Sequence, residues 1–86
     1  MSSSLTKEKI REELLGYFDA TFPLFDSEAP DETPLAEHGV DSLGTTNIVV
    51  HLEQQYQVEI EDSEITRANL GSLKSLVGFL DKKLNG

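Results

Sequence analysis

Apolar residues recur at the spacing of an α-helix in three separate stretches, and this periodicity constrains the fold more than any other feature of the chain. The pattern predicts helices from residue 7 to at most 22, from 42 to about 56 and from 73 to 85, and a shorter helix from 62 to about 68. Only residues 57–60 alternate as a strand would. Without a partner strand they are interpreted as an extended link. The sequence therefore predicts an all-α fold, a four-helix bundle of three main helices plus one short helix.

A long loop is predicted between the first two helices. Residues 23–40 contain three prolines and many acids, which oppose regular structure. A connection of this length needs contacts that hold it to the helices. The predicted anchors are its apolar residues, Leu24, Phe25, Leu35 and Val40. The acids between positions 26 and 37 lack the spacing and the central glycine of a calcium loop, so we interpret them as a solvated face.

Size and composition limit the classes of protein to consider. The 86 residues are enough for one small domain, predicted over residues 5–86 after a disordered N-terminus at 1–4. There is no cysteine, which excludes disulfides and thiolate metal sites, and we expect no metal. No apolar run approaches a membrane span, and the start lacks the layout of a secretion signal. We expect a cytoplasmic monomer that does not contact membranes.

The charge of the chain is strongly one-sided. A formal net charge of −9 argues against nucleic acid as a partner. After Arg11 the next basic residue is Arg67, and the segment between them is rich in acids. Such a surface steers basic partners toward it. Acids also serve simply to keep a small protein in solution, and the composition leaves both interpretations open.

The segment Gly39–Leu43 lies where the long loop meets the second helix. Asp41 is a good N-cap, because its carboxylate can accept hydrogen bonds from the free N–H groups of the first turn. Ser42 then falls at the first helical position, near the positive end of the helix dipole, which favours a phosphate ester. A serine held at a helix start without a base beside it indicates a site that another enzyme modifies.

Serine hydrolysis is the catalytic alternative, and it requires a base against the serine. His51 lies nine residues along the same helix, about 13 Å away by axial rise, and cannot reach Ser42. His38 lies in the loop and could approach, but no third group is evident to orient its imidazole. We therefore predict that the chain is not an enzyme and has no catalytic residues.

The second helix has two different faces. Its predicted core face consists of Thr45, Ile48, Val49, Leu52 and Tyr56. Leu43, Asn47 and Val50 fall on the opposite face, beside the serine. Two outward apolar residues one helical repeat apart indicate a docking strip. We predict that Leu43, Asn47 and Val50 bind partner enzymes, and that Glu53 and the acids at 59–64 add electrostatic steering.

Three segments occur together in this chain: Gly39-Val40-Asp41-Ser42-Leu43, the helix end Leu52-Glu53-Gln54-Gln55-Tyr56, and Val58-Glu59-Ile60. In this order and length the chain resembles the acyl carrier protein family over essentially its whole length, as a discrete, stand-alone carrier. The resemblance implies that a phosphopantetheinyl transferase attaches 4′-phosphopantetheine from coenzyme A to Ser42 through a phosphodiester, and that Asp41 assists its recognition. The terminal thiol of that arm would carry the acyl group as a thioester.

The resemblance also implies partners that load and process the acyl group, such as a ketosynthase, an acyltransferase or a ligase. Fatty-acid carriers have acids two and five residues after the serine, where this chain has Gly44 and Asn47. This difference favours a carrier of polyketide or related specialised metabolism. Peptidyl carriers have a second glycine where this chain has Val40, which favours acyl over aminoacyl cargo.

Three alternatives remain at this point. The first two are a fatty-acid synthase carrier and an aminoacyl or peptidyl carrier of a nonribosomal pathway. The third belongs to a different class. It is an acidic, carrier-like interaction module that binds a basic partner and has no prosthetic group.

Overall fold

The computed structural model describes residues 5–86, so the disorder predicted for residues 1–4 lies outside the described residues. In chain order the elements are α1 (Lys7–Thr21), the 3-10 helix η1 (Leu35–His38), α2 (Ser42–Tyr56), the 3-10 helix η2 (Asp62–Glu64), α3 (Arg67–Leu70) and α4 (Leu73–Asn85). The three main helices begin where the sequence predicts, because a capping side chain precedes each of them. Thr6, Asp41 and Ser72 accept hydrogen bonds from the first-turn N–H groups of α1, α2 and α4.

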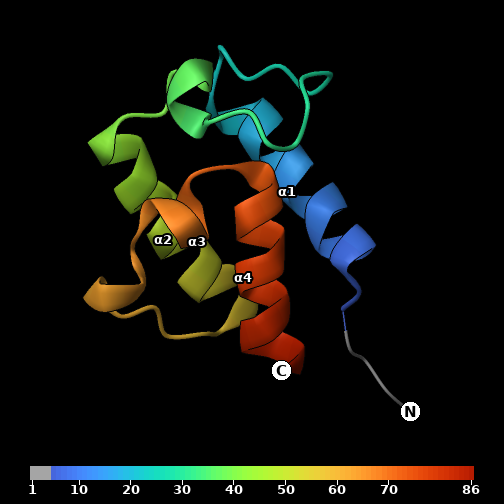
Figure 1. The fold of residues 1–86 in the computed structure, drawn as a ribbon, viewed down its shortest axis with the longest axis vertical. Coiled ribbons are helices and arrows are strands. Elements are labelled where there is room, and N and C mark those ends of the chain that lie inside the picture. The colour runs from blue at the N-terminus through green and yellow to red at the C-terminus, as the bar shows by residue number, and fades with distance from the viewer. Residues whose placement is uncertain (1–4) are drawn as a thin grey trace.

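The helix α4 runs through the middle of the bundle (Figure 1). It packs against α1 and against the short helix α3 that precedes it. Two side-chain pairs join α1 to α2. The rings of Tyr17 and His51 stack with 3.7 Å between their centroids, and the Tyr56 hydroxyl donates to the Glu13 carboxylate at 2.6 Å. The all-α fold, with three main helices, one short helix and a long loop between α1 and α2, is confirmed.

The core is built from one apolar stripe of each main helix. Its members on the helices are Ile10, Leu14, Phe18, Ile48, Val49, Leu52, Leu73, Leu76, Val77 and Leu80. The short helices η1 and α3 add Leu35 and Leu70, and the links before α2 and η2 add Val40 and Ile60. The core face predicted for α2 is confirmed at its three aliphatic positions. Thr45 and Tyr56 lie at the edge of this face and are only partly buried.

The prediction of the short helix is wrong in its position. Glu61 and Glu64 close the 3-10 turn η2 by reciprocal bonds between side chains and backbone N–H groups. The Thr66 side chain then starts α3 by accepting from the N–H of Asn69 at 3.2 Å. Because this cap moves the helix toward the C-terminus, Asn69 and Leu70 lie inside it, beyond the end predicted near residue 68.

The long loop is anchored by only some of the predicted residues. Leu35 and Val40 are buried, and the Phe25 ring packs against Phe18 with 5.3 Å between centroids. Leu24 is 72% exposed, so its prediction as a core anchor is wrong. The Phe25 N–H donates to the Phe22 carbonyl at 3.0 Å, which closes a turn. Leu24 lies at the corner of this turn and therefore points outward, while Phe25 points inward.

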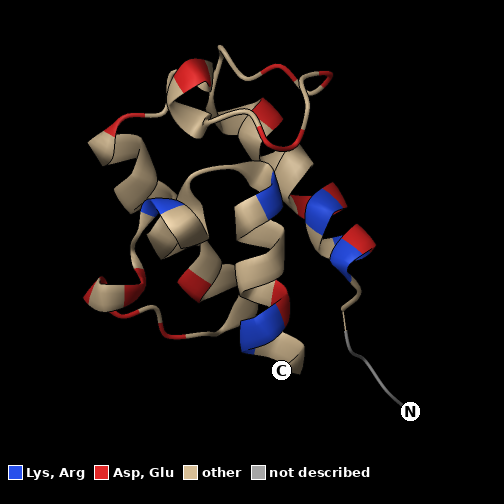
Figure 2. Ribbon diagram, viewed as in Figure 1, with Lys and Arg blue, Asp and Glu red and all other residues tan. Residues whose placement is uncertain are grey.

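Charged groups are separated over the surface. Acids gather on the long loop and around η2, whereas lysines and arginines occur mainly on the first turns of α1 and on α4 (Figure 2). Asp31 departs from the solvated face predicted for the loop acids, because the Arg11 guanidinium donates to its carboxylate at 2.7 and 2.9 Å. This pairing lowers the pKa of Asp31 below its ordinary value. The Asp31 carbonyl also accepts from the Lys74 N–H, so this residue ties the loop to α1 and α4.

We expect Asp31→Asn to lower the urea midpoint at neutral pH and to have no effect in acid. The folded-state pKa is lowered, so the stabilisation is fully present above the ordinary value of 3.8 and is lost as the pH falls through the folded value. Denaturation curves at neutral and acid pH measure this. Glu32→Gln is the control, because the Glu32 carboxylate lies 3.7 Å from the Lys74 ammonium and both side chains are exposed. If the urea midpoint of Asp31→Asn stayed below that of the parent chain in acid, the role of Asp31 would lie in packing and not in charge.

Candidate functional site

Gly39 ends the loop just before the candidate serine. Its φ of +83° lies in the left-handed region, which other residues rarely adopt. Its N–H donates to the Ala36 carbonyl at 3.1 Å and ends η1. A Cβ at this position would also lie 2.9 Å from Cδ1 of Leu24. The glycine therefore provides both the turn and the close approach of the outward leucine.

Gly39→Ala is expected to lower the free energy of unfolding by about 1–2 kcal/mol, the usual penalty for a side chain in the left-handed region. Urea denaturation followed by circular dichroism measures this. Gly16→Ala is the matched control, because Gly16 lies inside α1 with nothing within 4 Å of its would-be Cβ. That change should raise stability by about 1 kcal/mol through helix propensity. Equal stability of Gly39→Ala and the parent chain would contradict the prediction.

Asp41 and Ser42 have the geometry expected of a capped helix start. Oδ1 of Asp41 accepts from the Gly44 N–H at 2.8 Å, and its carbonyl accepts from the Thr45 N–H at 2.8 Å. Ser42 is the first residue of α2, and it is exposed. Within residues 5–86 the Ser42 hydroxyl makes no hydrogen bond. Its side chain is therefore free to enter the active site of another protein.

Neither histidine is placed to activate this serine. His38 is buried, where its Nδ1 accepts from the Asp26 N–H at 3.3 Å and its ring lies 4.7 Å from that of Phe25. These contacts give it a structural role inside the loop. His51 is stacked on Tyr17, and partial burial lowers its pKa. The described residues thus provide no general base for Ser42.

Gly44 has a packing role that its sequence position does not reveal. It is buried, and a Cβ there would lie 3.1 Å from both the Phe22 ring and a methyl group of Val40. Of the two positions at which fatty-acid carriers have acids, Gly44 therefore faces inward. Asn47, the other such position, is exposed. It remains available to distinguish partners.

The predicted docking strip lies on the surface. Leu43 is 70% exposed and Val50 45% exposed, and Asn47 lies between them along α2. Glu53 is different, because it is only half exposed and its carboxylate accepts from the Ile60 N–H at 2.9 Å. Glu53 thus ties the end of α2 to the link that follows. Glu64, one of the acids predicted to steer partners, is paired with Lys83 at 2.7 Å.

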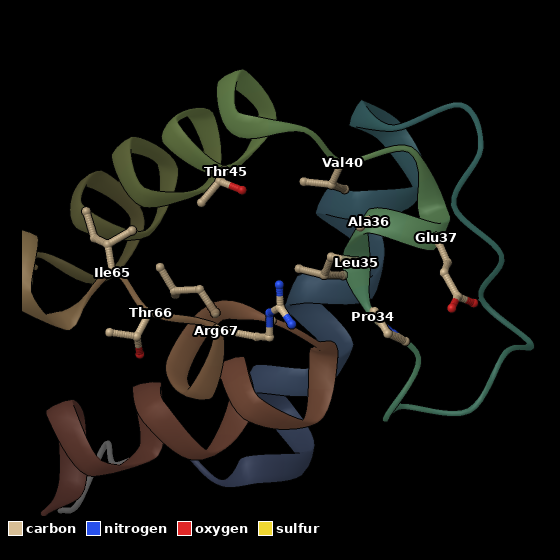
Figure 3. Close-up of a pocket in the computed structure, with 11 residues that line it drawn as sticks. Pro34, Leu35, Ala36, Glu37, Val40, Thr45, Ile65, Thr66 and Arg67 are labelled. Atoms are coloured by element: carbon tan, nitrogen blue, oxygen red, sulfur yellow. The ribbon is translucent and has the colours of Figure 1, made fainter.

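An open groove of about 500 Å³ lies beside the start of α2 (Figure 3). Leu35 and Val40 line it from the loop side, Thr45 from α2, and Ile65, Arg67 and Leu70 from α3 and the residues before it. We call it the Arg67 groove. The Leu35 N–H donates to the Gly71 carbonyl at 2.9 Å, which joins its two sides. Sequence patterns did not reveal this groove, because its walls are distant along the chain. The isolated basic residue Arg67 was the available signal.

A comparison with protein-family models identifies the family of the chain. Residues 10–80 match the family model described as a phosphopantetheine attachment site, which covers most of the 86-residue chain. The chain belongs to the phosphopantetheine-binding carrier family. No curated protein and no solved structure matched it. The resemblance to a phosphopantetheine-binding carrier is thereby confirmed, and such a carrier is non-catalytic with 4′-phosphopantetheine as its prosthetic group.

The start of α2 fits the prosthetic group of such a carrier. Ser42 is exposed at the first position of α2, and the neighbouring Asp41 carboxylate is engaged by the Gly44 N–H, so the serine hydroxyl is accessible for a phosphate ester. The bound group supplies the thiol on which a carrier holds its cargo. In the part of the carrier that the structure describes, no helix combines the length and apolar character needed to cross a membrane.

Proposed function

We propose that Ser42 is the residue to which the phosphopantetheine arm is attached, and that the chain carries acyl groups as thioesters between the enzymes of a biosynthetic pathway. The observation that carries this proposal is the exposed Ser42 hydroxyl at the capped start of α2, which has no hydrogen-bond partner in the described part of the chain and lies within the span of the family match. In the attachment step the serine oxygen forms a bond to phosphorus of coenzyme A, 3′,5′-ADP leaves, and the transferase accepts the serine proton. Asp41 holds the helix start in place for this step.

The strip of Leu43, Asn47 and Val50 is proposed as the surface that partners recognise. These partners are the phosphopantetheinyl transferase and the enzymes that load and process the acyl group. The strip contains no charge, and two of its three side chains are apolar and exposed. Enzymes with apolar docking surfaces suit it better than enzymes with basic patches. This supports a role in specialised metabolism, of polyketide or related type, over a role in fatty-acid synthesis.

Intact mass spectrometry after incubation with coenzyme A and a broad-specificity transferase tests the attachment residue. The parent chain should gain the mass of one phosphopantetheinyl group, and Ser42→Ala should gain none. Ser72→Ala is the control, because it also removes a serine at a helix start but at a buried position. Absence of any gain in the parent, or a gain that survives Ser42→Ala, would overturn the proposal. An unmodified chain isolated from cells with an active transferase would favour the interaction module instead.

A further inference from the structure

The Arg67 groove contains a cation that has no ion-pair partner among residues 5–86. The ion pairs of residues 5–86 use Arg11, Lys74 and Lys83, and Arg67 takes part in none of them and in no side-chain hydrogen bond. Its side chain reaches from α3 into the space between Thr45 and Leu35 (Figure 3). The Glu37 side chain, at the rim, points away from this space.

The position of Arg67 is supported by a close backbone approach. A Cβ on Gly71 would lie 2.9 Å from Cγ of Arg67 and would collide with the Arg67 carbonyl oxygen. The glycine therefore lets the arginine stem lie against the end of α3. The groove around the guanidinium is mainly apolar, with Leu35, Val40 and Leu70 all buried. Arg67 itself is exposed, so its guanidinium can be reached from solvent as well as from the groove.

The groove is within easy reach of an arm attached to Ser42. Thr45, which lines the groove, follows Ser42 by three residues on α2, so the two side chains are neighbours on the helix surface. The groove volume of about 500 Å³ is that of a small-molecule site. A group carried on the arm can therefore turn back into the groove without a change of fold.

We propose that the Arg67 groove binds the cargo of this carrier, and that the preferred cargo is a short acyl group ending in a carboxylate. This rests on the proposed attachment at Ser42. The planar guanidinium binds a carboxylate through two parallel hydrogen bonds, and the apolar walls enclose the short methylene chain. The same cation repels the ammonium group of an aminoacyl cargo, so the groove selects by charge.

The test compares two cargoes of nearly the same shape on the full chain. Malonyl- and acetoacetyl-phosphopantetheine are installed from the corresponding coenzyme A thioesters, and loading is verified by intact mass. Proton–nitrogen correlation spectra then follow the Arg67 Nε–H and the backbone N–H groups of Thr45 and Leu70. The malonyl form should shift these signals relative to the unloaded holo form. The acetoacetyl form, which has a methyl group in place of a carboxylate oxygen, should leave them near the holo positions.

Variants assign the effect to the arginine. Arg67→Gln should lose the shifts that only the malonyl form shows, whereas Lys82→Gln, which removes an exposed cation from the end of α4, should keep them. High salt should weaken them by screening. The cargo proposal alone would be overturned if both cargoes shifted the signals equally, or if the malonyl shifts survived Arg67→Gln. It would also be overturned if attachment of the unloaded arm shifted the signals, relative to the unmodified chain, as much as the malonyl group does relative to the holo form. That last result would assign Arg67 to the phosphodiester. Failure to load Ser42 at all would overturn both proposals.

Discussion

Phe18→Ala is expected to lower the free energy of unfolding by about 3–5 kcal/mol, the usual cost of removing a buried aromatic ring. This is a large fraction of the roughly 5–15 kcal/mol that stabilises a small domain. Phe18 is fully buried on α1, and its ring contacts those of Tyr17, Phe22 and Phe25. Its loss leaves a cavity at the point where the end of α1 meets the long loop. Urea denaturation followed by circular dichroism measures the change.

Tyr17→Phe is the matched control for this substitution. It keeps an adjacent ring in the same aromatic cluster and removes only a hydroxyl, whose hydrogen bond to the Asn47 carbonyl is long at 3.4 Å. Its effect should stay below about 1 kcal/mol. If Phe18→Ala cost no more than Tyr17→Phe, the aromatic cluster would not be the main support of the loop.

Leu43→Asp is expected to reduce kcat/KM for phosphopantetheinylation about tenfold or more, with unchanged helix content. Leu43 is 70% exposed at the second position of α2, so its removal leaves no cavity. An aspartate in the first turn also complements the helix dipole, so the fold is retained. The loss would come from the docking strip, where one exposed apolar residue can supply much of the binding energy. Initial rates of mass gain at several chain concentrations, with circular dichroism alongside, measure both properties.

The control for Leu43→Asp places the same charge elsewhere on α2. Gln55 is exposed and lies about 120° around the helix from Leu43, away from the strip. Gln55→Asp should therefore leave kcat/KM near the parent value. Equal losses in the two variants would indicate a general charge effect on the transferase. A full rate with Leu43→Asp would show that Leu43 is not part of the transferase contact.

The features that were predicted correctly are those that depend on neighbours along the chain. A capping side chain bonds to N–H groups two or three residues away, so Thr6, Asp41 and Ser72 could be recognised from sequence alone. The same holds for Ser42, whose exposure follows from its place at a helix start. The outward faces of Leu43 and Val50 follow from helical periodicity.

The features that were missed depend on residues distant along the chain. In the sequence, Asp31 does not differ from the other acids of the loop. Its role appears only in the structure, where Arg11 on α1 donates a hydrogen bond to it. Gly44 looks like a surface position until the Phe22 ring is placed over it. Arg67 becomes a candidate ligand for cargo only because η1 and α2 form the other walls of its groove. Composition and periodicity do not predict such contacts, because tertiary packing determines which distant residues come together.

The inward-facing Gly44 has a consequence for redesign of the carrier. To exchange partners with a fatty-acid carrier, a protein engineer would graft that family's acids onto the two differing positions of α2. Only Asn47 is open to such a graft, because a new side chain there enters solvent. The Cβ of an acid at Gly44 would lie 3.1 Å from the Phe22 ring and from a methyl group of Val40, so these side chains would have to shift to admit it. Substitutions meant to change the partner preference should therefore be made around position 47 and should leave Gly44 unchanged.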